Sequence, residues 1–322
     1  MNEFELIERY FRRANRDPAV RIGIGDDAAV VAPAPGKELA FSVDMLVEGR
    51  HFLADVDPAA LGHKTLAVNL SDLAAMGATP RWALLAGALP DNDERWIKAF
   101  ANGLFALAER FGVALIGGDT TRGPRNLCVT IVGEVPAGAA ITRSGAAAGD
   151  DIYLSGTLGD AALALAALAG KTSVAADILV TLRQRLERPE PRVALGERLR
   201  GVASAALDIS DGLTGDLAHI LAASGVGADV EFARIPRSPA IEQRLSTHER
   251  NLALACLLAG GDDYELCFTA PPSAGDRVAA IAQELALPLT RIGVITSSRG
   301  LRVRDERGVE LSPLPAAFDH FR

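Results

Sequence analysis

The chain has 322 residues, of which 23% are charged and 49% are hydrophobic, a composition typical of a globular protein long enough for two domains. Its net charge of -8, without a basic run, argues against a nucleic-acid partner. No apolar run approaches the roughly 20 residues of a membrane span, and FELIERYFRRAN near the start favours an amphipathic helix over a signal peptide. We therefore expect a cytoplasmic protein with no membrane partner.

Helices and strands are predicted to alternate along the first part of the chain, which is typical of the α/β or α+β class. Asp57 is the expected N-cap of one helix, with Pro58 at its first position. In chain order, the patterns predict helix 4–15, a Gly-Asp turn at 23–27, strands 28–32 and 39–44, a helix from Asp57 to about Met76, strand 82–88, helix 93–111, and strands 113–117 and 127–135.

A small, Gly-rich segment, 137–150, separates this part from the next and predicts a domain boundary. We expect a domain over 1–137, a linker over 138–149 and a second domain over 150–322. The elements predicted beyond it are strand 151–155, helices 159–169, 174–186 and 192–200, strand 203–208, helix 213–224, strand 228–232, a helical stretch to about 259, strand 264–269, helix 274–286, and strands 289–295 and 301–305.

Aspartates recur where predicted strands end and on the helix from Asp57 to Met76. A single Gly-Asp or Asp-Gly pair is best explained as an ordinary turn. Several together favour a shared site, because ligands in α/β sheets bind at the carboxyl ends of strands and glycine admits close approach. Oxygen-only donors suit magnesium, manganese or calcium. The clusters are Gly25-Asp26-Asp27, Ser42-Val43-Asp44, Asp72, Gly117-Gly118-Asp119, Asp208-Ile209-Ser210-Asp211 and Gly260-Gly261-Asp262-Asp263-Tyr264-Glu265.

Asp72 lies on a helix that is apolar on two stripes and is therefore expected to be largely buried. A buried carboxylate needs a partner, which the sequence leaves open as a lysine, an arginine or a metal ion.

Acidic clusters are compatible with phosphate binding if magnesium bridges the carboxylates and the substrate phosphates. This arrangement points to phosphoryl transfer. Arg143, in TRSG, is either a phosphate clamp or a surface arginine in a linker. The chain has neither a GxxxxGK[ST] loop nor the HRD and DFG motifs of protein kinases.

Seven runs resemble the thiamine-monophosphate kinase family, within the superfamily that includes aminoimidazole ribonucleotide synthetase. They are GIGDDAAV, SVDMLVEGRHF, KTLAVNLSDLAAMGATP, LIGGDTTRGP, ITRSGAAAGD, ALDISDGL and GGDDYELCFT, with a C-terminal FDHF. The resemblance implies a two-domain aminoimidazole ribonucleotide synthetase-like fold, with an N-terminal α/β domain that forms a homodimer and a C-terminal α+β domain. It also implies that ATP and thiamine monophosphate give ADP and thiamine diphosphate.

The family's functional positions carry over by motif. The implied catalytic carboxylates are Asp27, Asp44, Asp72, Asp119 and Asp208, and the implied ligands of several magnesium ions are these five with Ser42, Val43 and Asp211. The implied ATP contacts are Gly118, Asp119, Arg143 and Ser210, and the implied acceptor contacts are His51, Asp262 and Phe318. Val43 stands where threonine is common, so only its carbonyl could bind a metal, and Asp262 stands where glutamate is common.

Three other functions compete with this interpretation. A nicotinamide-dependent oxidoreductase is suggested by Gly23, Gly25 and Ala28 with Asp44 about 20 residues on, but the following AAVVAPAP is a poor helix. A sister enzyme of the superfamily would use ATP on another acceptor. A non-catalytic metal or nucleotide binder would bind ATP without turnover.

Overall fold

The computed structural model describes residues 3–13, 17–305 and 307–316. Contacts between Cα atoms divide the chain into two compact units. Unit 1 comprises Met1–Leu73 and Ala78–Gly138, and unit 2 comprises Ala74–Gly77 and Ala139–Arg322. None of the helices in these described ranges combines the length and apolarity needed to cross a bilayer.

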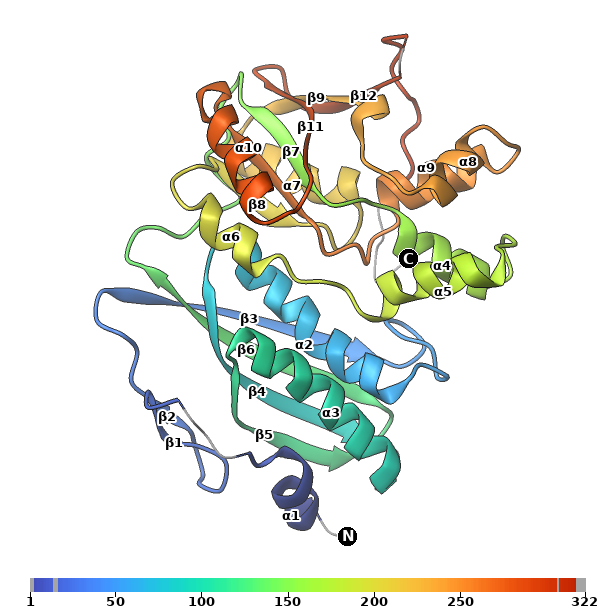
Figure 1. The fold of residues 1–322 in the computed structure, drawn as a ribbon. Coiled ribbons are helices and arrows are strands. Elements are labelled where there is room, and N and C mark those ends of the chain that lie inside the picture. The colour runs from blue at the N-terminus through green and yellow to red at the C-terminus, as the bar shows by residue number, and fades with distance from the viewer. Residues whose placement is uncertain (1–2, 14–16, 306, 317–322) are drawn as a thin grey trace. The chain divides into compact units, whose positions relative to one another are not determined.

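Unit 1 is built on a four-stranded sheet with the strand order β3-β6-β4-β5 (Figure 1). Only β4 and β5 run parallel, and the other neighbours are antiparallel. A separate ribbon pairs β1 with β2. The bounds are β1 (Val20–Ile22), β2 (Val30–Val31), β3 (Lys37–Val47), β4 (Thr79–Leu89), β5 (Ala114–Arg122) and β6 (Asn126–Pro136).

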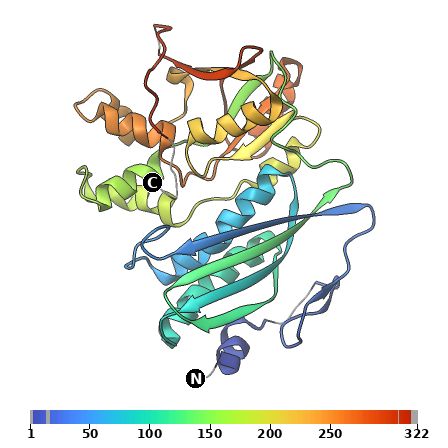
Figure 2. The ribbon, with the colours of Figure 1, turned by 180° about the vertical axis from the view of Figure 1, so that it is seen from behind.

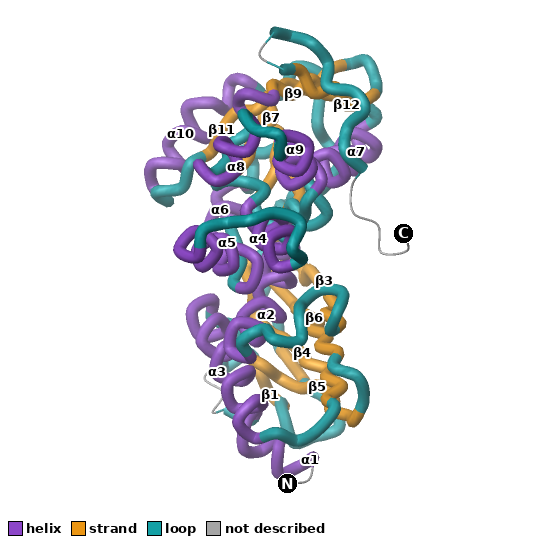
Figure 3. The backbone as a smooth tube through the Cα atoms, turned by 90° about the vertical axis from the view of Figure 1, so that its right-hand side faces the viewer, coloured by secondary structure: helices purple, strands orange, loops and turns teal. Residues whose placement is uncertain are grey.

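Two long helices, α2 (Pro58–Ala75) and α3 (Glu94–Phe111), cover one face of this sheet, as the side view in Figure 3 shows. They approach closely at two glycines: a Cβ at Gly62 would lie 2.0 Å from the Phe100 carbonyl oxygen, and one at Gly103 would lie 1.9 Å from that of Ala59. The chain therefore needs glycine at this helix crossing. The unit begins with α1 (Glu3–Leu6) and one π-helical turn, η1 (Ile7–Phe11).

The other face of the sheet has two regions. Near β1 and β2, Trp82, Ile116 and Val132 form a small buried cluster with residues of that ribbon. Over the rest, no helix of the described part of unit 1 covers the strands (Figure 2). The apolar side chains left exposed there are Phe41 at 65%, Val43 at 60%, Met45 at 51% and Leu84 at 36%.

Unit 2 contains a six-stranded sheet with the order β12-β9-β11-β7-β10-β8, in which only β12 and β9 pair in parallel. One face carries Ile152 and Leu154 into the main core, while Tyr153 and Phe268 stack at 5.2 Å on the other. The strands are β7 (Asp151–Ser155), β8 (Ala205–Asp208), β9 (Gly227–Glu231), β10 (Leu266–Ala270), β11 (Leu289–Thr296) and β12 (Gly300–Arg304).

The helices of unit 2 follow the predicted alternation with the strands. Their apolar residues, such as Leu163, Leu217 and Leu257, complete the core on the Ile152 face. The bounds are α4 (Asp160–Leu168), α5 (Ala176–Glu187), α6 (Val193–Leu199), α7 (Leu213–Ser224), α8 (Pro239–Leu245), α9 (Arg250–Ala259) and α10 (Gly275–Glu284), with short turns η2 (Phe232–Arg234) and η3 (Pro272–Ala274). The predicted α/β and α+β class is confirmed.

Three predictions of local structure are wrong. The helix expected over 4–15 ends at Phe11, after which Arg12 is extended. Strand β5 does not stop at Gly117 but continues to Arg122, because it pairs with β4 as far as Leu89. Asp119 therefore lies inside β5 rather than after it. Strand β3, predicted to end at Asp44, continues to Val47.

The structure also argues against a dinucleotide-binding site at Gly23, Gly25 and Ala28. After Gly25 the chain enters the short strand β2, so no helix N-terminus follows to bind a pyrophosphate. Segment 139–149 belongs to unit 2, where the Ala206 N–H donates to the Thr142 carbonyl at 3.1 Å and the Gly149 N–H to that of Ile295 at 2.9 Å. Its role as a linker stays a prediction.

Candidate functional site

Strand β3 and helix α2 bring three of the predicted residues together in unit 1. Ser42 and Asp44 alternate along β3 and so share one face of the sheet. The Ser42 hydroxyl donates a hydrogen bond to Asp72 Oδ2 on α2. The backbone N–H of Asp44 donates to Asn69 Oδ1, one helical turn before Asp72, at 3.1 Å. Ser42, Asp44 and Asp72 therefore form one oxygen-rich group between strand and helix.

Asp72 is half-buried, and helix α2 around it is almost entirely buried, as predicted. The sequence left the partner of Asp72 open as a lysine, an arginine or a metal ion. The structure adds a hydroxyl partner, that of Ser42. Asn69 was missed by the sequence reasoning. Its position three residues before Asp72, on the same helix face, is the signal that could have found it.

Two further carboxylates of the predicted set, Asp27 and Asp119, are exposed in unit 1. Asp119 stands in β5 opposite Ala86 of β4, one row of the ladder beyond Gly118 and Leu85. Gly118 has φ 151°, and a Cβ there would lie 1.8 Å from the Leu85 carbonyl oxygen. Only glycine fits, because the backbone of β4 comes this close. The expected approach of a ligand to Gly118 stays a prediction.

Asp27 follows the turn at Gly25, whose φ is 115°. Its N–H donates to Asp26 Oδ1 at 3.0 Å, a local bond that shapes the turn. The described contacts do not bring Asp27 together with Ser42, Asp44 and Asp72. Val43 points its side chain to the uncovered face, and because that side chain is a hydrocarbon, only the Val43 carbonyl could bind a metal.

His51 lies in the loop that follows β3. The ring Nδ1 of His51 accepts the backbone N–H of Val47 at 3.0 Å, and the backbone N–H of His51 donates to the Val47 carbonyl at 2.9 Å. The buried ammonium of Lys64, on α2, donates to the His51 carbonyl at 3.4 Å. The loop is thus fixed to both neighbouring elements, and Lys64 is a second residue that the sequence reasoning did not single out.

In unit 2, the loop after β8 holds a second predicted group: Asp208, Ser210 and Asp211. Asp208 is buried and ends the strand, as predicted. Asp216, in the first turn of α7, accepts the N–H groups of Ser210, Asp211 and Gly212 with Oδ2, each at 3.0 Å. Burial raises the pKa of Asp216 to about 7, while these three N–H donors oppose the shift.

The segment Gly260–Glu265 lies against this loop. The N–H groups of Asp262 and Tyr264 donate to the carbonyls of Ser210 and Ile209, both at 2.8 Å. A Cβ at Gly261 would lie 2.4 Å from the Ser210 carbonyl oxygen, so glycine is required at this approach. The structure therefore brings Asp262, a predicted acceptor contact, next to Ser210, a predicted ATP contact.

Arg143 and Phe318 are the two remaining predicted site residues. Arg143 is exposed, and its carbonyl accepts a hydrogen bond from Ser224 Oγ at 3.3 Å. An exposed guanidinium on a fixed backbone suits a phosphate clamp. Phe318 lies outside the described residues.

The donor set fits magnesium in its chemistry. All candidate donors are carboxylate, hydroxyl or carbonyl oxygens. Within residues 3–13, 17–305 and 307–316, no three His, Cys, Asp or Glu side chains form a ready group that could hold a metal. Smaller groups, such as Asp72 with Ser42, suit an ion that takes one or two carboxylates and completes its shell with substrate phosphates and water.

Comparisons with known proteins cover nearly the whole chain. Two family models match it: AIR synthase related protein, N-terminal domain, over residues 25–135, and AIR synthase related protein, C-terminal domain, over residues 147–306. A thiamine-monophosphate kinase of Salmonella typhimurium is 47% identical over 323 residues, which span 99% of this chain and 98% of that protein.

Solved structures also match the fold of this chain. The crystal structure of thiamine-monophosphate kinase from Stenotrophomonas maltophilia has a TM-score of 0.86 at 49% identity, covering 94% of this chain and 96% of that one. The structure of AaThiL complexed with AMPPCP and TMP has a TM-score of 0.78 at 30% identity, covering 90% of this chain and 89% of that one.

Proposed function

This chain belongs to the thiamine-monophosphate kinase family, and we propose that it transfers the γ-phosphoryl group of ATP to thiamine monophosphate, giving thiamine diphosphate and ADP. The resemblance inferred from its motifs is thereby confirmed. The observation that carries the activity is the full-length match to these kinases, one of them described with AMPPCP and TMP. The two oxygen-rich groups, Ser42-Asp44-Asp72 and Asp208-Ser210-Asp211, supply fitting chemistry.

The acceptor is itself a phosphate, whose second pKa is near 6, so its oxygen is already ionised at neutral pH. No general base is needed to activate it. The protein has two tasks: to bring two polyanions together and to hold them in line. We infer direct transfer without a phosphoenzyme. Isolating a phosphorylated protein after mixing with labelled ATP alone would contradict this.

Asp27, Asp44, Asp72, Asp119 and Asp208 are the carboxylates that would hold magnesium, with Ser42, the Val43 carbonyl and Asp211 as further ligands. When bound, magnesium ions would neutralise charge on the phosphates of both substrates. Gly118, Arg143 and Ser210 would contact the nucleotide, with Arg143, which is exposed, reaching its phosphates. His51, Asp262 and Phe318 would hold the acceptor.

We also propose that the protein is a homodimer. The uncovered face of unit 1 presents Phe41, Val43, Met45 and Leu84, and monomeric proteins rarely leave such an apolar patch exposed. A second copy of the same face is the simplest cover. The three free cysteines, Cys128, Cys256 and Cys267, support a reducing compartment such as the cytoplasm.

The direct test is ADP release by the purified protein with ATP and magnesium, comparing thiamine monophosphate, thiamine and no acceptor. We expect release only with thiamine monophosphate. Chelation by EDTA should abolish it, and Asp119→Ala should lower kcat by about 100-fold or more. Asp276→Ala, which removes an exposed aspartate of α10 outside the proposed site, is the control.

The other outcomes are equally informative. Release with thiamine alone would mean that the acceptor group is a hydroxyl rather than a phosphate. Release with neither compound would redirect the assignment to another acceptor within the superfamily. ATP binding without turnover on any acceptor would indicate a nucleotide-binding protein.

A further inference from the structure

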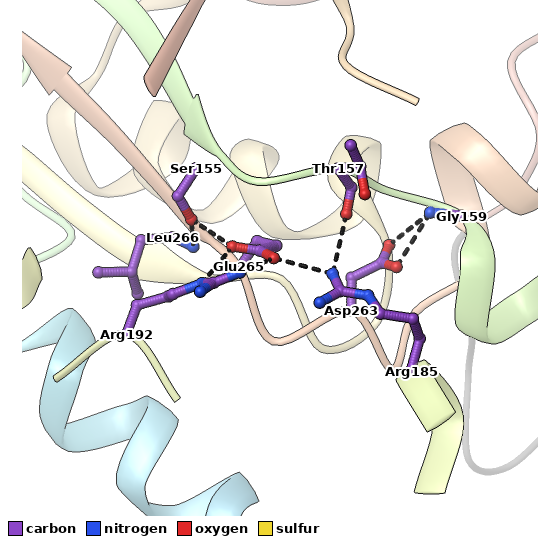
Figure 4. Close-up of polar contacts among 8 residues, drawn as sticks. All are labelled: Ser155, Thr157, Gly159, Arg185, Arg192, Asp263, Glu265 and Leu266. Atoms are coloured by element: carbon purple, nitrogen blue, oxygen red, sulfur yellow. Dashed lines mark hydrogen bonds and ion pairs between the residues drawn. The ribbon is translucent and has the colours of Figure 1, made fainter. Parts of the chain in front are cut away.

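A buried ionic network surrounds Glu265, three residues after Asp262, and Figure 4 shows its polar contacts. Glu265 is 1% exposed. Its carboxylate accepts hydrogen bonds from Ser155 Oγ at 2.6 Å, from Arg185 Nη2 at 2.8 Å and from Arg192 Nε at 2.6 Å. A Cβ at Gly156 would lie 2.2 Å from Glu265 Oε1, so the chain keeps glycine there to admit the carboxylate.

Such a network is weak grounds for a purely stabilising role. Desolvating one carboxylate and two guanidinium groups offsets most of the attraction between them, and apolar side chains of similar size would often serve stability as well. A buried, fully bonded charge does, however, allow only one local conformation. The question is which conformation Glu265 fixes.

The backbone next to Glu265 is unusual. Asp262 has φ 60° and Tyr264 has φ 50°, left-handed values that side-chain-bearing residues adopt only rarely. Such residues persist when the surroundings hold them in place. Between them, Asp263 is buried, and its carboxylate accepts the Gly159 N–H at 2.9 and 3.1 Å. Asp263 and Glu265 thus secure the segment through their side chains.

The backbone of the same segment is bonded to the loop after β8. The Ile209 N–H donates to the Glu265 carbonyl at 2.8 Å, and Ser210 and Ile209 accept the N–H groups of Asp262 and Tyr264. The carboxylate of Glu265 is therefore held by Arg192 and Arg185, while its backbone is bonded directly to the loop that carries Asp208 and Ser210.

We propose that Glu265, together with Arg192 and Arg185, is a positioning device that holds the left-handed backbone at Asp262 and Tyr264 and thereby sets the position of Asp262, the proposed contact of the acceptor substrate. This rests on the proposed function for its kinetic consequence, but its structural part does not. None of the three side chains is assigned to touch a substrate. They act through the backbone of residues 262–264.

The test compares Arg192→Lys with Arg302→Lys. Lysine keeps the charge but loses the planar fork with which Arg192 bonds both oxygens of Glu265. Arg302 bonds Asp229 through Nε at 2.6 Å in β12, at the opposite edge of the same sheet from β8. Its substitution is the control for losing an arginine–carboxylate hydrogen bond elsewhere in unit 2.

We expect Arg192→Lys to raise KM for thiamine monophosphate about tenfold or more, because small misplacements of a contact weaken productive binding steeply. KM for ATP should change by about twofold or less, because Asp216 still holds the Ser210 loop through three N–H groups. Arg302→Lys should leave both values near wild type. Equal changes of acceptor KM in both variants, or no change in Arg192→Lys, would overturn the proposal.

Amide hydrogen exchange gives a readout that does not need activity. The N–H groups of Asp262 and Tyr264 should exchange faster in Arg192→Lys than in wild type or Arg302→Lys, because their bonds to Ser210 and Ile209 then open more often. Unchanged protection of these two amides would overturn the positioning role. If wild type releases no ADP with thiamine monophosphate, the proposed function fails, and the exchange comparison still decides whether the network holds this backbone.

Discussion

The ring nitrogen of His51 that faces Val47 determines what its other ring nitrogen can do. Because Nδ1 accepts the Val47 N–H at 3.0 Å, it carries no proton, and the proton of the neutral ring is on Nε2. His51 is therefore an N–H donor at Nε2, which suits hydrogen bonding to a phosphate or pyrimidine acceptor. The sequence pointed to this residue through the GRHF run, but not to the tautomer.

Two substitutions separate the roles of the ring nitrogens. His51→Asn keeps an acceptor near the Nδ1 position and loses the Nε2 donor, whereas His51→Gln keeps an amide donor near Nε2 and loses the Nδ1 acceptor. We expect His51→Asn to raise KM for thiamine monophosphate about tenfold, and His51→Gln to raise it less, because a hydrogen bond to a charged group is worth about 1.5–3 kcal/mol. Steady-state kinetics with both substrates measures this. If His51→Asn binds the acceptor as well as wild type, the imidazole only fixes the loop.

At the scale of elements, the N-terminus of α4 shows how distant segments complete one another. Its N-cap, Gly159, has no side chain to cap the helix, and the carboxylate of Asp263 accepts the backbone N–H of Gly159 itself. Asp263, Glu265 and Asp160 are all buried, and they outnumber the two arginines Arg185 and Arg192 around Glu265. Burial raises the pKa of Asp263 well above its ordinary value and also raises that of Asp160.

This shift has a definite sign. A carboxyl group whose pKa is raised by folding keeps its proton in the folded state after the unfolded chain has lost it. Increasing pH from the ordinary value near 4 through the raised value therefore lowers the free energy of unfolding. Asp263→Asn cannot ionise, so we expect it to weaken this decline by about 1 kcal/mol or more. Urea denaturation of both proteins from about pH 5 to about pH 8 measures the difference.

The control for this experiment is Asp276→Asn, which changes an exposed aspartate in the first turn of α10. It should leave the pH dependence of wild type unchanged. A parallel course for wild type and Asp263→Asn would show that Asp263 is ionised throughout and that Arg185 compensates its burial.

At the scale of the whole molecule, the proposed homodimer depends on the uncovered apolar face of unit 1. Phe41→Asp places a charge on that face, where Phe41 is 65% exposed in the single chain. We expect the dimer to dissociate, since an unpaired charge in an apolar interface costs several kcal/mol. Sedimentation velocity over a concentration series measures the mass.

The matched control is Val180→Asp on α5, because Val180 is 64% exposed but belongs to unit 2 and not to the sheet of unit 1. It should sediment as wild type does. A wild-type protein that is monomeric at all concentrations would refute the dimer, and dissociation by Val180→Asp as well would place the interface elsewhere.

The sequence by itself determined the order and type of nearly all elements, because hydrophobic periodicity and the capping residues are local signals. Asp57 caps α2 through the Ala60 N–H at 2.8 Å, and Asp208 ends β8, both as predicted. The motif runs also identified the family, since they keep residue types and order over most of the chain.

Tertiary structure decided what depends on partners distant in sequence. Strand β5 runs through Gly118 and Asp119 because β4 pairs with it, a contact that no local pattern of glycine and aspartate reveals. Glu265 and Arg192 are 73 positions apart, and nothing in either neighbourhood indicates that one carboxylate receives two arginines. Periodicity records only the direction in which a side chain points, whereas pairing and charge compensation depend on which elements the fold brings together.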